Sequence, residues 1–178
     1  SMKLNASISR LKGVNNNIQN AISFLEVQDG ILQGSADILT RMGELKALSQ
    51  DVLKNSSDRA NYNSEFVSLQ QQLHQIAGEK FNGVSLFATT ATDASGAASG
   101  TDAVFGGNAL ENNEVEVYTS ELGGGGSSVS INKAALLSAV TFTSATDTQV
   151  VEFGKAGSSS FAATGAATAI DLDDLGAS

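Results

Sequence analysis

Residues 11–53, LKGVNNNIQNAISFLEVQDGILQGSADILTRMGELKALSQDVL, decide the fold of this chain. Apolar side chains recur here every seven positions, a spacing that keeps a stripe aligned along one side of an α-helix. The first track of this stripe consists of Leu11, Ile18, Leu25, Leu32 and Leu39, and the second of Ile31, Ile38, Leu45 and Val52. The pattern predicts a helix over about residues 5–53 that packs against other helices, and it indicates an assembly surface rather than a catalytic one.

A second helix is expected over about residues 58–78. The polar run Asn55-Ser56-Ser57 reads as a break, and Ser57 or Asp58 would cap the helix that follows it. The apolar residues of this helix are spaced four and three apart, which suits an antiparallel partner of the first helix. They are Tyr62, Phe66, Leu69, Leu73 and Ile76.

The tripeptide Phe81-Asn82-Gly83 predicts a β-hairpin over residues 81–88. A two-residue type I′ turn needs positive φ at both central positions, and Asn82-Gly83 is a strong sequence signal for it. Residues 3–88 are therefore expected to form a helical rod domain that ends in a β-hairpin.

The remainder, residues 89–178, is rich in glycine, serine and alanine and is expected to be a variable, mainly β, surface-exposed segment. Residues 89–112 read as an exposed loop. Residues 115–118 and 128–131 alternate like paired strands joined by Gly123–Gly126, and a short helix or turn at 133–140 and a strand at 149–153 should follow. The fold class is α+β, a long antiparallel helical hairpin followed by a β-rich segment.

Composition and charge argue against several classes of function. The chain has no cysteine and no proline, which rules out a disulfide framework and fits long uninterrupted helices. Its net charge of −9 lies entirely in residues 89–178, which hold two Lys/Arg against eleven Asp/Glu. Such an acidic segment repels nucleic acid and anionic membranes. The sequence shows no apolar run long enough to span a bilayer and no hydrophobic signal segment after Met2.

Enzymatic chemistry finds little support in the residues, so we expect no catalytic site, no cofactor and no bound metal. His74 is the only histidine, which excludes a pair of histidine ligands, and it is expected to be a surface or packing residue. Asp171, Asp173 and Asp174 lack the glycine and distal glutamate of a calcium loop and read as a solvated loop. Gly123–Gly126 lacks the lysine of a phosphate-binding loop and reads as a hairpin connector.

Four stretches resemble the N-terminal half of the rod domain of the bacterial flagellin family. They are NNNIQNAISFLEVQDG at 15–30, LTRMGELKALSQ at 39–50, SDRANYNSEFVSL at 57–69 and IAGEKFNGVSL at 76–86. The resemblance implies a secreted structural subunit of the extracellular flagellar filament, which polymerises for motility. Its partners would be other flagellin subunits and a flagellar export chaperone.

The resemblance also implies that something is missing from the ends of this chain. Flagellins pack two N-terminal helices against one C-terminal helix, whereas this chain stops near residues 171–178 and begins with a Ser1-Met2 pair typical of a cleaved tag. We therefore expect a shortened form whose first helix has lost part of its natural cover. A helix exposed in this way should make the chain self-associate as its concentration rises.

Vertebrate Toll-like receptor 5 binds many flagellins through the rod domain, and the matching positions here are Arg41, Leu45 and Glu65. Arg41 and Leu45 are four residues apart and share one helical face. A forked arginine beside a leucine makes a plausible hot spot in an interface. The alternative for Leu45, which also belongs to the apolar track, is an ordinary place in the core.

Two other readings of function stay open at this point. One is the junction protein between hook and filament, which belongs to the flagellin family. The other is a secreted adhesin or binding module whose second half is the recognition surface.

Overall fold

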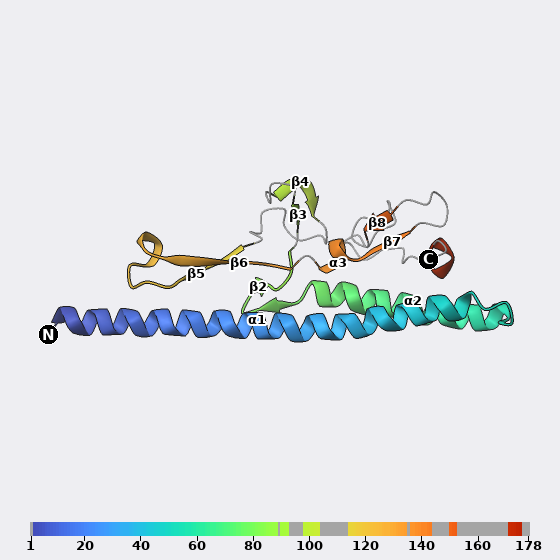
Figure 1. Ribbon diagram of the computed structural model, residues 1–178, viewed down its shortest axis with the longest axis horizontal. Coiled ribbons are helices and arrows are strands. Elements are labelled where there is room, and N and C mark those ends of the chain that lie inside the picture. The colour runs from blue at the N-terminus through green and yellow to red at the C-terminus, as the bar shows by residue number, and fades with distance from the viewer. Residues whose placement is uncertain are drawn as a thin grey trace.

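The computed structural model describes residues 2–88, 90–92, 98–103, 114–134, 136–143, 150–152 and 171–175. The main part of the fold is a helical rod that consists of α1 (Met2–Ser49) and α2 (Ser56–Ala77), which run antiparallel (Figure 1). α2 lies along the C-terminal half of α1, and a long β-hairpin lies along the N-terminal half on the same side. This arrangement confirms the expected α+β class, while the division into domains at residue 88 stays a prediction.

The buried residues of α1 are Phe24, Gln28, Ser35, Met42 and Leu45. Leu45 is 0% exposed, and Ile31 and Ile38 pack on the buried core. Leu32 and Leu39 of the first track are half-buried and pack on the same core, so both tracks flank the buried face. Toward the ends of the helix the tracks leave the core, since Leu11 and Leu25 are 54% and 41% exposed and Val52 is 88% exposed. The role of the stripe in assembly stays a prediction.

On α2 the predicted stripe does face α1. Phe66 and Leu73 are buried, and Tyr62, Leu69 and Ile76 pack around them as partly buried residues. Two further residues of α2, Gln70 and Ala77, are also buried. The spacings of four and three were thus a reliable guide to the face of this helix.

The turn between the helices differs from the prediction at both ends. α1 stops at Ser49, not Leu53, because the side chain of Asp51 accepts a hydrogen bond from the backbone N–H of Leu53 and holds a local turn. The N-cap of α2 is Asn55, whose side chain accepts from the N–H of Asp58 at 2.8 Å. Asp58 accepts in return from Asn55, so the two form a capping box, and neither Ser57 nor Asp58 is the cap.

The predicted β-hairpin follows α2 directly. Strands β1 (Lys80–Phe81) and β2 (Val84–Ser85) pair antiparallel, and Asn82 and Gly83 have φ of 50° and 80°, which confirms the predicted turn. The ring of Phe81 meets that of Phe24 edge to face at 6.1 Å. Leu86 and Phe87 then enter the core beside Leu73, so this short hairpin joins the end of α2 to the middle of α1.

A second antiparallel hairpin consists of β5 (Glu114–Tyr118) and β6 (Ser128–Asn132). Opposite pairs Val115↔Ile131 and Val117↔Val129 place four apolar side chains on one face, and Val117 is buried. Its connection contains the short 3-10 helix η1 (Gly123–Gly125), so Gly123–Gly126 is indeed a hairpin connector. At Gly126 a Cβ atom would collide with the side chain of Ser120, so this tight turn needs glycine.

Shorter elements complete the described part of the chain. Strands β3 (Thr90–Thr92) and β4 (Ala98–Ala103) pair antiparallel where an exposed loop was expected, which the β-branched threonines favour. α3 (Leu136–Ala139) lies inside the predicted helix region, with Leu136 in the core. β7 (Thr141–Thr143) pairs with β8 (Val150–Glu152), within the predicted strand at 149–153. Last comes the 3-10 helix η2 (Leu172–Asp174).

Candidate functional site

Arg41 and Glu65, predicted to share a receptor-binding surface, do lie together. The guanidinium of Arg41 donates to both carboxylate oxygens of Glu65, at 2.7 and 3.2 Å, and also to Glu44 at 3.0 Å. The hydrogen bond to Glu65 is the main reason that the pKa of Arg41 is raised, and the same bond lowers the pKa of Glu65. All three side chains are exposed, so the cluster is open to a partner.

Leu45, the third predicted receptor residue, does not join this surface. Its side chain is fully buried in a cluster with Met42, Phe66 and Leu172, so the core alternative describes its position. Leu172 comes from η2, which docks on the end of the rod. The structure thus brings two of the three predicted residues to the surface and covers the third.

The acidic segment around η2 is fastened to both helices, so it is not a solvated loop. The ammonium of Lys46 donates to the carbonyls of Leu172 and Leu175, at 3.0 and 2.8 Å. The side chain of Asn63 donates to Asp171 at 2.8 Å and accepts from the N–H of Leu172 at 2.9 Å. The sign of this docking in the sequence was Leu172, an apolar residue between two aspartates, which packs in one cluster with Leu45 and Phe66 of the rod.

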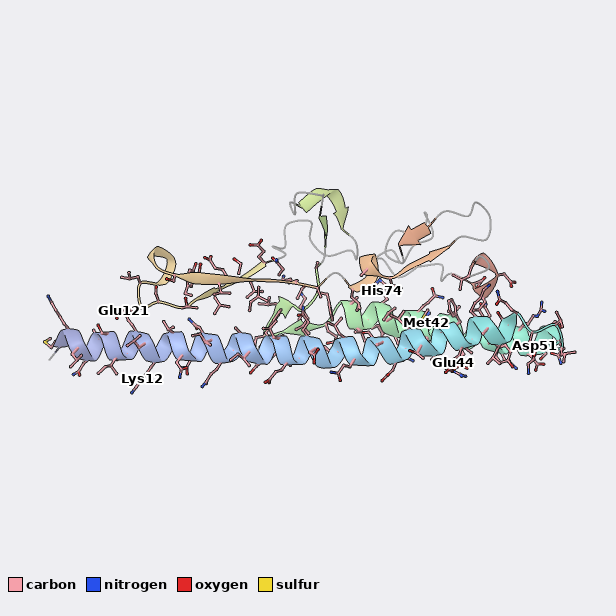
Figure 2. The ribbon with its side chains drawn as sticks, viewed as in Figure 1. Lys12, Met42, Glu44, Asp51, His74 and Glu121 are labelled. Carbon is pink, nitrogen blue, oxygen red and sulfur yellow. The ribbon has the colours of Figure 1, made fainter. Side chains whose placement is uncertain are left out.

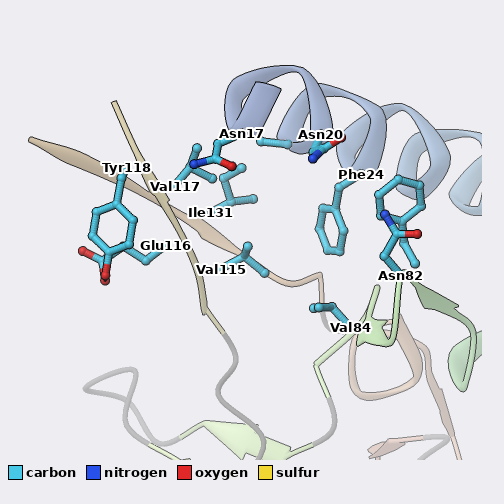
Figure 3. A pocket seen from close by; sticks show the side chains of 12 residues that line it. Asn17, Asn20, Phe24, Asn82, Val84, Val115, Glu116, Val117, Tyr118 and Ile131 are labelled. Atoms are coloured by element: carbon cyan, nitrogen blue, oxygen red, sulfur yellow. The ribbon is translucent and has the colours of Figure 1, made fainter. Parts of the chain in front are cut away.

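A groove of about 290 Å³ opens between α1, the turn of β1–β2 and the β5–β6 hairpin. Phe24 of α1, Val84 of β2 and the hairpin residues Val115, Val117 and Ile131 supply its apolar walls, and Asn17 and Asn20 lie along its helical side (Figure 3). The tip of the hairpin is held near α1 by an ion pair between Arg10 and Glu121 at 3.8 Å. Sequence patterns gave no indication of this groove, because it forms only where the two segments meet.

Apolar side chains are also exposed on the N-terminal half of α1. Figure 2 shows side chains extending from this half of the rod on the side away from the β5–β6 hairpin, and Lys12 points away from the hairpin that carries Glu121. The exposed apolar residues of this half are Met2, Leu4, Ile8, Leu11, Ile22, Leu25 and Val27. Surface of this kind on one helix favours association with another polypeptide.

The described parts of the molecule contain no cluster of side chains suited to holding a metal ion. Within these parts no three His, Asp or Glu side chains lie close enough to hold a metal ion. His74 is half-buried on α2, and burial lowers its pKa. Of the helices in the described ranges, none is long and apolar enough to cross a membrane.

Gln28 is a structural residue that the sequence analysis missed. Its side chain is 7% exposed and donates to the backbone carbonyl of Leu86 at 2.7 Å. The available signal was its position, four residues after Phe24 and three before Ile31 on the buried face of α1. A polar residue at such a position indicates a partner inside the core.

Known proteins match this fold and its sequence. The family model for the bacterial flagellin N-terminal helical region matches residues 1–92. Over 87 residues the chain is 33% identical to a flagellar filament 31.3 kDa core protein of Treponema maltophilum, covering 48% of this chain and 30% of that protein. Over 93 residues it is 30% identical to a flagellin of Listeria innocua, covering 52% of this chain and 32% of that protein.

A solved structure shows the same architecture. The crystal structure of Bacillus cereus flagellin matches with a TM-score of 0.50 at 24% identity, over 68% of this chain and 58% of that one. The chain spans about a third of the length of the curated relatives named above. Because the family model covers more than half of its residues, the chain belongs to the bacterial flagellin family.

Proposed function

We propose that this chain is a structural subunit of the extracellular bacterial flagellar filament, secreted through the flagellar export apparatus and held in place by other flagellin subunits. The role is mechanical and involves no catalysis. Membership of the flagellin family supports this proposal, as does the similarity to a flagellar filament core protein.

The proposal rests chiefly on the N-terminal half of α1, which α2 does not cover. α1 is 48 residues long, yet α2 has only 22 residues and lies along its C-terminal half. The N-terminal half keeps apolar residues such as Leu4 and Leu11 exposed although the β5–β6 hairpin lies beside it. Burial of this surface needs further polypeptide, and in a filament the neighbouring subunits would supply it.

Electron microscopy of the full gene product, purified and concentrated, tests this role. Long regular filaments would support it. Short caps would favour the hook–filament junction protein, and monomers would favour an adhesin or binding module. Either result would overturn the proposed role.

A second candidate function is recognition by Toll-like receptor 5. The observation in its favour is the exposed cluster of Arg41 with Glu65, which spans both helices of the rod. An arginine already oriented by two carboxylates loses little side-chain entropy when a partner binds. Leu45 would not contribute in this conformation, because it is fully buried beside Met42, Phe66 and Leu172.

Receptor-reporter dose responses for Arg41→Ala separate this function from simple assembly. The expected result is a weaker response than that of the unaltered protein. Arg59→Ala is the matched control, because Arg59 is an exposed arginine on α2 that lies outside the cluster. Equal responses for Arg41→Ala and the unaltered protein would remove the proposal.

A further inference from the structure

Two consecutive apolar residues protrude at the end of the rod. Val52 and Leu53, in the turn between α1 and α2, are 88% and 89% exposed. The turn that presents them is ordered by hydrogen bonds from Asp51 to the carbonyl of Leu48, from Lys54 to the carbonyl of Asp51, and from the N–H of Leu53 to the Asp51 carboxylate. Exposed side chains on a fixed turn form a rigid apolar knob, here called the Val52–Leu53 knob.

From this knob and the groove described above, we propose that the Val52–Leu53 knob of one copy inserts into the groove between α1 and β5–β6 of a second copy. The proposal rests on the filament function and names the surfaces through which two subunits would meet. The groove, at about 290 Å³, lies near the lower end of the ~300–1,000 Å³ usual for binding pockets, a size suited to two aliphatic side chains.

The knob cannot reach the groove of its own chain. Asn20, beside the groove, and Val52 are 32 residues apart, so at 1.5 Å per residue the two surfaces are separated by about 48 Å along the rod. Different surfaces of the two copies would meet, which makes the contact heterologous. Contacts of this kind continue from copy to copy instead of closing a dimer, as a filament requires.

Charge complements shape at this contact. One charged side chain, that of Glu116, lines the groove. Glu121, at the tip of the hairpin, is already paired with Arg10 of its own chain. Lys54 directly follows the knob in the sequence, so insertion of the knob would bring its ammonium towards Glu116 of the second copy. A second copy of this chain therefore offers the groove two aliphatic side chains followed by a cation.

The contact is expected to be weak by itself. Two aliphatic side chains bury far less than the ~1,000 Å² of a lasting interface. On the same helix, the exposed Leu4, Ile8 and Leu11 precede the groove and would lie beside the incoming rod. The knob would thus set the register between staggered copies, while the flanking residues add area.

Cysteine cross-linking tests the contact directly, because the chain contains no natural cysteine. The two variants are Leu53→Cys on the knob and Val84→Cys on the groove wall, where Val84 is partly exposed. α2 alone spans about 33 Å between them, too far for a disulfide within one copy. As matched control, Gln19→Cys lies on α1 beside the groove residues Asn17 and Asn20 but does not line it.

Mixing Leu53→Cys with Val84→Cys should give disulfide-linked dimers about tenfold faster than mixing Leu53→Cys with Gln19→Cys. The double variant Leu53→Cys/Val84→Cys should give a ladder of oligomers on a non-reducing gel. Equal rates for the groove and control mixtures would overturn the contact. If that happened while the unaltered chain still formed filaments, the proposed function would stand and only this contact would fail.

Discussion

The side-chain amide of Gln28, in the middle of α1, donates a 2.7 Å hydrogen bond to the backbone carbonyl of Leu86, 58 residues away in the sequence. Both residues are buried, Leu86 at 1% exposed. The bond fixes the segment after the β1–β2 hairpin against the rod. It also gives a hydrogen-bond partner to a buried carbonyl that follows strand β2 and takes no part in the β1–β2 pairing.

Replacing Gln28 by alanine should lower the free energy of unfolding by about 1–3 kcal/mol, because a buried carbonyl loses its partner. Urea denaturation followed by circular dichroism measures this change. Gln33→Ala is the control, since Gln33 lies on the same helix but bonds to Asp29 in solvent, and it should change stability by no more than about 0.5 kcal/mol. Equal losses for the two variants would show that the buried bond is not important.

Two glycines should respond to alanine in opposite directions. Gly83 has φ of 80°, so Gly83→Ala should destabilise the protein by about 1–2 kcal/mol. Gly43 lies inside α1 with nothing within 4 Å of an added Cβ, so Gly43→Ala should stabilise it by about 0.5–1 kcal/mol. Thermal unfolding of both variants checks the signs, and a stabilising Gly83→Ala would contradict the assigned turn.

Local signals in the sequence were enough to predict most elements but not their contacts. The heptad spacing predicted α1, and the F-N-G tripeptide predicted the turn of the β1–β2 hairpin. The alternation of apolar and polar residues predicted β5 and β6. Spacing did not show that Gln28 and Ser35 lie on the buried face of α1 between the two tracks, because a polar side chain interrupts the apolar pattern there. Only the packing of α2 and the hairpins places that face.

The candidate site, too, was predictable from the sequence only in part. Arg41 and Glu65 were assigned by resemblance to one receptor-binding surface, and their side chains do lie in contact, while the receptor role stays a prediction. Leu45 was placed with them, but it is buried beside Phe66 of α2 and beside Leu172, which is 127 residues away in the sequence. The groove likewise depends on how distant segments meet, and periodicity within one helix carries no information about that.

The apolar side chains exposed on the N-terminal half of α1 should make the chain self-associate. Sedimentation velocity over rising concentration should show species larger than a monomer, and the variant Ile8→Glu/Leu11→Glu should shift them toward the monomer, because charge opposes burial of that face. Ser9→Glu/Asn16→Glu adds the same charge at exposed polar positions of the same helix. If the control variant were as monomeric as the stripe variant, net charge alone would explain the effect. A strictly monomeric unaltered chain would contradict the prediction outright.

His74 should make stability depend on pH. Burial lowers its pKa below the usual value of 6.5, so the unfolded chain binds a proton more readily than the folded one. Stability is therefore greatest above the unfolded pKa and falls as the pH drops through that value towards the folded pKa. Urea midpoints between about pH 7.5 and pH 5.5 should fall less for His74→Gln than for the unaltered protein. The same slope in both would assign the loss to other groups.

The most direct test of the filament role is quantitative mass spectrometry of filaments sheared from the cells that make this protein. Peptides from the rod, such as residues 13–41, should be present in amounts that mark the chain as a major building block of the filament. The chain's absence from filaments, while it is abundant in the same cells or their medium, would contradict its assignment as a filament subunit.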